Sequence, residues 1–299
     1  MQNYAKLSKN LSGVFRAASA VFIMLTAGGG VFAGGAPDGG KGKKAPITVI
    51  SREEGSGTRT AFVEIVGVLD SAKNDAITQT AEVTNNTAVM MASVAGDKNA
   101  IGYISLGSLN NTVKALKVDG AAATTADVKS GAYKIARPFN IVTGDTVSPA
   151  AQHFINFILS AEAQDVVAKN GYLPVDTAQK AALPASPGTK IVVAGSSSVT
   201  PLMEKLREAY IAKYPGVNVE IQQSDSSTGI NSVISGVCDI GMASRTLSRS
   251  EIEKGVSNIV IATDGIAIIV NRENPLDGLS REQIKDIYLG GITDWLELK

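Results

Sequence analysis

Hydrophobic and polar positions follow two alternating periods along most of the chain after residue 46. Short apolar runs rich in β-branched residues, which are typical of strands, alternate with stretches whose apolar residues recur every three or four positions, as in helices. This alternation is typical of an α/β fold. The clearest predicted strands are 47–50, 100–105, 139–143, 190–194 and 217–221.

Polar turns rich in serine, threonine and glycine join a predicted strand to a predicted helix at three places, 51–60, 195–201 and 224–229. The first N–H groups of a helix have no partner within it, and the helix dipole is positive there, so such a turn can hold an anion. Each turn is also consistent with an ordinary capped helix, and that alternative stays open for any one of them. The repetition favours a small tetrahedral oxyanion, bound where the strands of an open α/β sheet end.

Two arginines accompany these turns at the ends of predicted strands. Arg52 lies in the first turn, and Arg245 follows the strand-like run 238–244. A guanidinium group donates two parallel hydrogen bonds to an oxyanion. In the first turn, the Ser56 and Thr58 hydroxyls can either cap the following helix or donate to a ligand.

The second half of the pattern contains longer elements. Residues 148–169 carry apolar positions at helical spacing and predict one long helix, and 259–270 predicts two apolar strand halves around Asp264-Gly265. Residues 279–295 predict a helix followed by a glycine turn and the single tryptophan.

The first forty residues have the pattern of an export signal. Basic residues but no acid precede Asp38, residues 17–27 are apolar, and 31–33 resemble a small-residue cleavage site. The apolar run is too short and too interrupted by glycine to predict a membrane anchor. These patterns predict a signal peptide over 1–33, a flexible basic linker over 34–46, and a second linker over 176–189.

The composition of the chain limits the classes of function that are expected. The chain has 299 residues, is 44% hydrophobic and 19% charged, and carries no formal net charge, so a packed core is expected and a bulk attraction to nucleic acid is not. Cys238 and His153 are single occurrences that predict packing roles. With one of each, neither a zinc site nor a Ser-His or Cys-His pair has support, and we expect no cofactor and no metal.

Eight segments together resemble the periplasmic phosphate-binding proteins of high-affinity phosphate ABC transporters, and the resemblance covers nearly all of 46–299. They are Ser51–Thr58, Gly102–Ser105, Gly171–Val175, Gly195–Leu202, Ser226–Ile230, Asp239–Arg245, Asp264–Asn271 and Gly290–Trp295. In that family, however, the Gly-Ser-Ser-Ser turn comes first and the Gly-Tyr-Leu-Pro segment last. The order here predicts a circular permutation, with 176–189 joining the family's usual termini. Such a cut in an exposed glycine-rich loop breaks few buried contacts.

The resemblance implies a two-lobe periplasmic-binding-protein fold of the type II kind, an α/β fold with two crossover strands as hinge and the ligand between the lobes. One lobe would be 139–263 and the other 47–138 plus 264–299. The crossings would fall near Arg137-Pro138 and Thr263-Asp264. A ligand that touches both lobes would close them.

The resemblance also implies phosphate-binding residues. Those that match the family motifs are Ser197, Ser198, Ser227 and Arg245 in one lobe, and Arg52, Ser56, Gly57 and Thr58 in the other. Arg245 departs from the family, whose best-described members carry an aspartate that accepts the proton of hydrogenphosphate and repels sulfate. An arginine cannot accept a hydrogen bond. It could instead form a nearby ion pair or add positive charge to the site, and Asp225 is a possible substitute acceptor.

The predicted function is therefore extracytoplasmic capture of inorganic phosphate for an ABC importer. A monomer that is not an enzyme would deliver phosphate to a membrane permease. Two alternatives stay open, a binder of another oxyanion such as sulfate, molybdate or a phosphonate, and a serine-dependent phosphatase or hydrolase. The second would need a general base or a metal cluster, and the sequence shows neither at a recognisable spacing.

Overall fold

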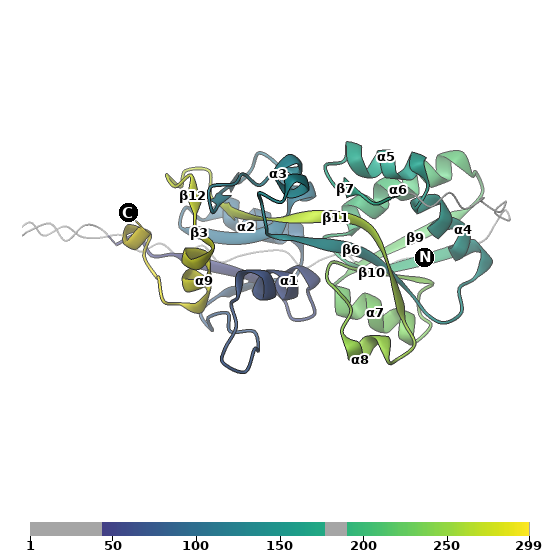
Figure 1. Ribbon diagram of the computed structural model, residues 1–299, viewed down its shortest axis with the longest axis horizontal. Helices are drawn as coiled ribbons and strands as arrows, with labels where there is room; N and C mark the ends of the chain where they lie inside the picture. The colour runs from purple at the N-terminus through teal and green to yellow at the C-terminus, as the bar shows by residue number, and fades with distance from the viewer. Residues whose placement is uncertain (1–43, 177–189, 299) are drawn as a thin grey trace, which may run out of the picture. The chain divides into compact units, whose positions relative to one another are not determined.

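The computed structural model describes residues 44–176 and 190–298. The predicted signal peptide lies outside these residues, as do both predicted linkers apart from 44–46 and Asp176. Strands and helices alternate along the described chain, which confirms the predicted α/β class (Figure 1). None of the described helices is long and apolar enough to cross a membrane.

The strands are β1 (Thr48–Arg52), β2 (Glu82–Thr84), β3 (Ala100–Ser105), β4 (Lys114–Ala115), β5 (Lys117–Val118), β6 (Ala136–Thr143), β7 (Leu173–Pro174), β8 (Lys190–Ser196), β9 (Asn218–Ser224), β10 (Ile240–Ala243), β11 (Ser257–Val270) and β12 (Gly278–Leu279). The helices are α1 (Gly57–Val66), α2 (Thr87–Gly96), α3 (Thr125–Ser130), α4 (Pro149–Ile158), α5 (Ala161–Lys169), α6 (Thr200–Lys213), α7 (Ser226–Ile234), α8 (Arg249–Ile252) and α9 (Arg281–Leu289), with short 3₁₀ turns η1 (Leu106–Ser108) and η2 (Trp295–Leu298).

The main sheet is mixed, in the order β2-β1-β3-β11-β6-β10-β8-β9. At one end β1 pairs in parallel with β2 and β3, and at the other β8 pairs in parallel with β9 and β10. Between these parallel groups, β11 and β6 run antiparallel to each other and to their outer neighbours. The carboxyl ends of two separate parallel groups are thereby available for a site.

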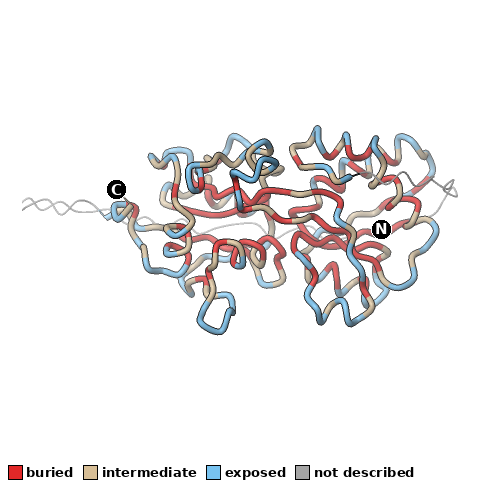
Figure 2. Tube along the Cα trace, in the orientation of Figure 1, coloured by how far each residue is buried: buried red, intermediate tan, exposed pale blue. Residues whose placement is uncertain are grey.

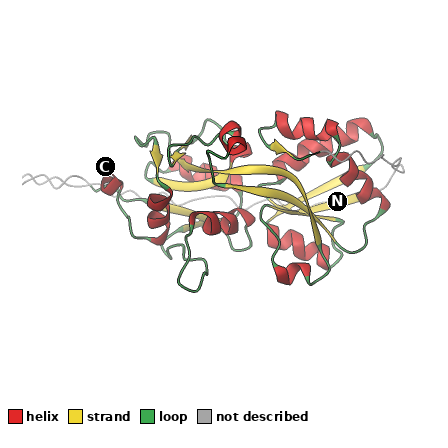
Figure 3. Cartoon of the chain, viewed as in Figure 1, coloured by secondary structure: helices red, strands yellow, loops and turns green. Residues whose placement is uncertain are grey.

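The hydrophobic core divides into two parts along the chain. Buried apolar residues of 45–135 and 266–298 pack with one another, and those of 139–262 pack separately. We call the first part the Arg52 half and the second the Ser197 half. In each half, helices cover both faces of the strands (Figure 3). The strand residues alternate accordingly, as where Ile268 faces the cluster of α1 and α9 while Ile269 faces that of α2.

β6 and β11 connect the two halves. They pair directly where the core divides, with Arg137 opposite Asp264 and Pro138 opposite Thr263. Buried positions continue along both strands through this crossing (Figure 2). The crossing is therefore a packed, hydrogen-bonded pair of strands, and β7 pairs with β11 beside it at Ala262 and Thr263.

Two predictions about element length were wrong. The helix predicted over 148–169 is two helices, because the chain leaves the helix at Leu159 and Ser160 caps a new one by accepting a hydrogen bond from the Ala163 N–H. The two strand halves predicted over 259–270 are one continuous strand, β11, since the main chain at Asp264 and Gly265 keeps its pairing with β6.

Candidate functional site

Four helix starts meet between the two halves. Thr58 and Thr87 stand in the first turns of α1 and α2, and Ser198 lies just before α6. The Ser198 hydroxyl lies 2.7 Å from that of Thr58 and 3.2 Å from that of Thr87. Ser226 opens α7 and completes the group, since its hydroxyl accepts a hydrogen bond from the Ser244 N–H at 3.1 Å. The buried hydroxyls that we call the hydroxyl cluster are those of Thr58, Thr87, Ser196, Ser198, Ser226 and Ser244.

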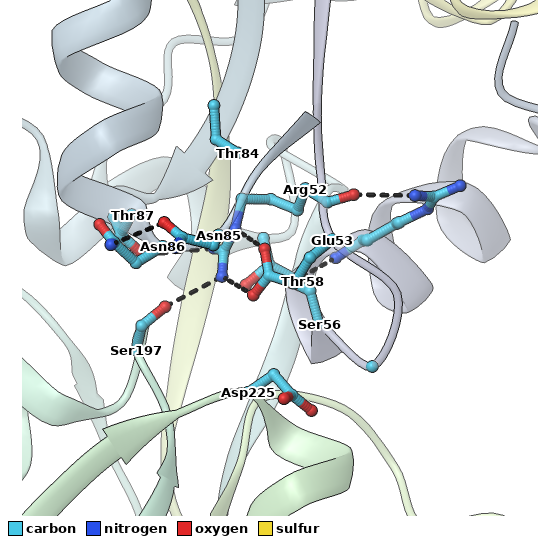
Figure 4. A network of polar contacts seen from close by, with 12 residues as sticks. Arg52, Glu53, Ser56, Thr58, Thr84, Asn85, Asn86, Thr87, Ser197 and Asp225 are labelled. Carbon is cyan, nitrogen blue, oxygen red and sulfur yellow. Dashed lines mark hydrogen bonds and ion pairs between the residues drawn. The ribbon is translucent and has the colours of Figure 1, made fainter. Parts of the chain in front are cut away.

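Arg52 brings a cation to this place from the end of β1 (Figure 4). Its side chain is among the largest that are fully buried, with the residue 1% exposed. Nε and Nη2 donate to the two Glu53 carboxylate oxygens at 2.7 Å, and Nη2 also donates to Ser197 Oγ of the other half at 2.9 Å. Nη1 reaches Thr87 Oγ1 at 3.4 Å. Arg52 therefore uses one edge for Glu53 and turns the other toward the seam between the halves.

The end of β1 is held by aromatic packing beneath it. The Tyr103 hydroxyl accepts a hydrogen bond from the Arg52 N–H at 3.1 Å and lies 2.9 Å from Ser51 Oγ. Its ring stacks on Phe62 of α1 with the centroids 4.1 Å apart. Burial raises the pKa of Tyr103 to about 12, so the hydroxyl stays protonated at neutral pH. This packing fixes the strand and the helix that carry Arg52 and Thr58.

A second buried arginine adjoins the hydroxyl cluster from β6. Arg137 is 3% exposed, and its Nη1 lies 2.6 Å from Asp264 Oδ2 on β11. Its Nη2 donates to Thr58 Oγ1 at 3.0 Å and its Nε to the Ser244 carbonyl at 3.2 Å. Burial lowers the pKa of Arg137 and raises that of Asp264, and the opposite charge of each partner counters both shifts.

Arg245 occupies a corner of the seam beside the hydroxyl cluster. Its guanidinium donates to both carboxylate oxygens of Glu251, at 2.7 and 2.8 Å, and to Ser227 Oγ at 3.0 Å. These bonds hold the pKa of Glu251 at about 2. Ser227 crosses to the other half, where its N–H and hydroxyl donate to the Gly55 carbonyl at 3.2 and 3.3 Å.

The remaining predicted positions support these helix starts. Ser56 caps α1 by accepting a hydrogen bond from the Arg59 N–H at 3.3 Å. Gly57 lies so close to the Ser226 and Ser244 hydroxyls that a Cβ would collide with them. Asp225 caps α7, its carboxylate accepting from the Thr228 N–H at 2.9 Å.

Each arginine at the seam is balanced by a carboxylate. The pairs are Arg52 with Glu53, Arg137 with Asp264, and Arg245 with Glu251. A site of this kind can hold an anion chiefly with its hydroxyl and N–H dipoles. Within 44–176 and 190–298, no group of three or more histidine, cysteine, aspartate or glutamate side chains is arranged to hold a metal.

Two pockets open beside the seam. One of about 460 Å³ is lined by Gly55, Thr60, Glu64, Ser227, Arg245, Thr246, Leu247 and Ser248. The other, of about 250 Å³, is lined by Thr87, Ala88, Met91, Ser108, Ser197, Pro201 and Gln223. Both have walls from the two halves, and they reach Arg245, Thr87 and Ser197 at the edges of the seam.

The sequence motifs predict that Arg52, Thr58, Ser197 and Ser198 belong to one site, and the structure places these four residues together. Sequence reasoning missed Thr87, although a strand, a polar turn and a helix also surround that residue, because the turn is built from asparagines. Asn86 caps α2 there, with its side chain accepting from the Val89 N–H. It assigned Arg137 only to the hinge. A single arginine within an apolar strand was a signal of buried polar contacts.

Most of the chain matches known proteins. A family profile described as a PBP superfamily domain matches residues 30–162 and 180–298. The chain is 53% identical over 274 residues to a protein named phosphate-binding protein PstS 2 from Streptococcus agalactiae serotype V, covering 90% of this chain and 93% of the relative. It is 43% identical to the crystal structure of a phosphate-binding protein of a phosphate ABC transporter from Streptococcus pneumoniae TIGR4, with a TM-score of 0.66 over 85% of this chain and 100% of that one. With a protein named PstS from Staphylococcus haemolyticus it shares 32% identity over only 111 residues, 35% of each chain.

Proposed function

The chain belongs to the PstS phosphate-binding proteins of the PBP superfamily, and from this premise we propose that it captures inorganic phosphate outside the cytoplasm for an ABC importer. The predicted periplasmic-binding-protein fold is confirmed by the same relatives. The proposal is carried by one observation. Arg52 and Thr58 of one half meet Ser197 and Ser198 of the other at 2.9 and 2.7 Å.

A tetrahedral anion in the seam would take over these hydrogen bonds. Arg52 turns one guanidinium edge toward the seam, and the starts of α1, α2 and α6 contribute hydroxyl and N–H donors around it. Helix starts and charge-assisted donors are the groups that bind phosphate oxygens best. We assign direct contact with phosphate to Arg52, Thr58, Ser197 and Ser198, with Ser56 and Gly57 shaping the α1 start.

Ser227 and Arg245 take a different part in the proposal. Their hydrogen bonds lead to the Gly55 carbonyl and to Glu251. They form a rim that closes over the anion when the halves come together, and β6 and β11 serve as the hinge. In this account the Arg52 half and the Ser197 half are the two lobes.

The proposal extends to the surroundings of the protein. Residues 1–33 act as an export signal, the protein works as a monomer outside the cytoplasmic membrane, and a membrane permease of an ABC transporter receives the phosphate. It is supported by the basic and apolar pattern of residues 1–33 and by the phosphate ABC transporter named for the Streptococcus pneumoniae structure.

A thermal-shift panel tests the ligand. Phosphate, sulfate, molybdate and a phosphonate are compared at equal concentration and pH, since a ligand that binds the folded state stabilises it by RT ln(1 + [L]/Kd). We expect the largest rise in melting temperature with phosphate. A larger rise with sulfate or molybdate would instead identify a binder of that oxyanion.

The same preparation tests the hydrolase alternative. We expect no release of phosphate from a nitrophenyl ester, because the serine hydroxyls of the seam are already hydrogen-bonded to neighbouring residues of the site. A release that Ser56→Ala abolishes would favour an enzyme.

We also propose the circular permutation relative to other family members. A permuted chain aligns in one stretch with only part of an unpermuted relative, and the match to the Staphylococcus haemolyticus protein ends after 111 residues. Placing residues 190–298 before 44–176 should lengthen that match to most of both chains. No lengthening would contradict the permutation.

A further inference from the structure

Arg137 stands where the two halves and the hinge meet. Its side chain leaves β6 at the crossing, and the planar group contacts β11, α1 and the end of β10 at once. Its Cζ also lies 5.0 Å from the centre of the Phe139 ring. An arginine so completely enclosed has one orientation available, since all three of its nitrogens are engaged.

The contact with Thr58 has a direction that chemistry imposes. A guanidinium has five N–H donors and no acceptor, so the bond of 3.0 Å from Arg137 Nη2 to Thr58 Oγ1 uses a lone pair of the hydroxyl. The single hydroxyl hydrogen of Thr58 must then point elsewhere. Its other neighbours are Ser198 Oγ at 2.7 Å and Ser244 Oγ at 3.4 Å.

From this geometry we infer that Arg137 is a positioning residue of the anion site: it keeps Thr58 as a hydrogen-bond donor toward the seam. The inference rests on the proposed function, because it names what Thr58 offers to phosphate. A hydroxyl without such a neighbour rotates freely and can turn its lone pairs toward an anion. With Arg137 in place, the hydrogen of Thr58 is directed to the side where Ser198 now lies.

Asp264 fixes Arg137 in turn. Its Oδ2 lies 2.6 Å from Nη1, and its Oδ1 accepts from the Gly107 N–H at 3.1 Å. The Gly265 carbonyl accepts a further bond from Nη1 at 3.2 Å. The ion pair through Nη1 therefore orients Nη2 of Arg137 toward Thr58. A pair that only stabilised the fold would not need the hydrogen bond from Nη2 to Thr58.

A double-mutant cycle between Arg137 and Thr58 tests the inference by isothermal titration with inorganic phosphate. Thr58→Val in the wild-type background should weaken binding by about tenfold or more, as expected when a hydrogen bond to a charged group is lost. In the Arg137→Lys background the same change should cost less than about threefold, because a lysine bound to Asp264 cannot also reach Thr58. If the losses of affinity in the two single variants simply multiply in the double variant, the inference is overturned.

Ser197→Ala supplies the matched control. The Ser197 hydroxyl also lies in the seam, but it accepts its hydrogen bond from Arg52. Ser197→Ala should weaken phosphate binding by the same factor in the wild-type and in the Arg137→Lys background. A cost that shrinks equally for Ser197→Ala would show that Arg137→Lys disturbs the whole seam, and would overturn the specific role.

A second variant keeps the test decisive if Arg137→Lys does not fold. The pair Arg137→Met with Asp264→Asn removes both buried charges together and leaves no N–H donor at position 137 for Thr58, so the cycle can be repeated on it. Failure of the proposed function has a different signature: the wild type would not bind phosphate at all, whereas failure of the inference leaves wild-type binding intact.

Discussion

Arg52 and Arg245 look alike in sequence and differ in the structure. Each lies at or just past the end of a strand, and each binds both oxygens of one carboxylate, Glu53 or Glu251. Arg52 is 1% exposed and extends to a serine of the opposite half, while Arg245 is 8% exposed and extends to Ser227 of its own half. In the proposed site, the half that the free guanidinium edge faces therefore distinguishes the arginine assigned to phosphate, Arg52, from the one assigned to the rim, Arg245.

The serines that accept from these two arginines differ in the same way. Ser197 accepts from Arg52 across the seam, and an incoming anion can replace it. The Ser227 hydroxyl accepts a hydrogen bond from Arg245 and donates one to the Gly55 carbonyl across the seam. The first contact is with a charge and the second with a neutral backbone group. The proposed function accordingly assigns the first contact to the anion and the second to closure.

The largest effect should separate the two arginines. Arg52→Gln removes a buried charge and should weaken phosphate binding between about a hundredfold and a few thousandfold. Arg245→Gln, the same change at the rim, should weaken it by less than about tenfold. Isothermal titration with phosphate measures both.

Stability provides the control for this pair. Because Arg52 is buried against Glu53, its replacement should also lower the melting temperature of the ligand-free protein, so both variants are titrated well below their melting points. Equal losses of phosphate affinity in the two variants would contradict the distinction between Arg52 as a phosphate contact and Arg245 as a rim residue.

A smaller effect should separate the two serines. Ser197→Ala removes a partner of a charged group and should cost about tenfold in phosphate affinity. Ser227→Ala should cost about threefold, because the neutral N–H bond from the same residue to Gly55 remains. A greater loss for Ser227→Ala, measured by the same titration, would return Ser227 to the group of direct ligands.

Much of this arrangement follows from local sequence. Strand, polar turn and helix are short-range patterns, so the α/β fold and the starts of α1, α6 and α7 could be predicted from the residues. Thr87 was missed because its turn lacks glycine and serine, although Asn86 caps a helix just as well.

The rest depends on contacts that local patterns do not contain. Arg137 meets Asp264, more than a hundred residues later, only because β6 and β11 pair in one register. The break between α4 and α5, in contrast, comes from a local contact, the Ser160 cap on the Ala163 N–H, and it was missed because the apolar positions continue at helical spacing on both sides. Register and packing determine which of several locally acceptable states is adopted.

The smallest effect concerns the rim and depends on pH. Arg245 and the N-terminus of α8 hold the pKa of Glu251 at about 2 in the folded protein, below the ordinary 4.5. A carboxyl group whose pKa is lower in the folded than in the unfolded protein stabilises the fold at pH values above its unfolded pKa. That contribution is lost as the pH falls through the folded pKa. Wild-type protein should therefore melt above Glu251→Gln at pH 5 to 7, and the difference should shrink steadily between pH 4.5 and 2.

Glu253→Gln is the matched control for this titration, measured by circular dichroism over the same pH range. Its carboxylate pairs with the exposed Arg249, and exposed pairs contribute little. The difference between this variant and wild type should be small and nearly independent of pH. If Glu251→Gln behaved in the same way, the Arg245 corner would carry no stabilising charge pair. The contrast between a buried anion site and a supporting rim would then rest on Arg52 alone.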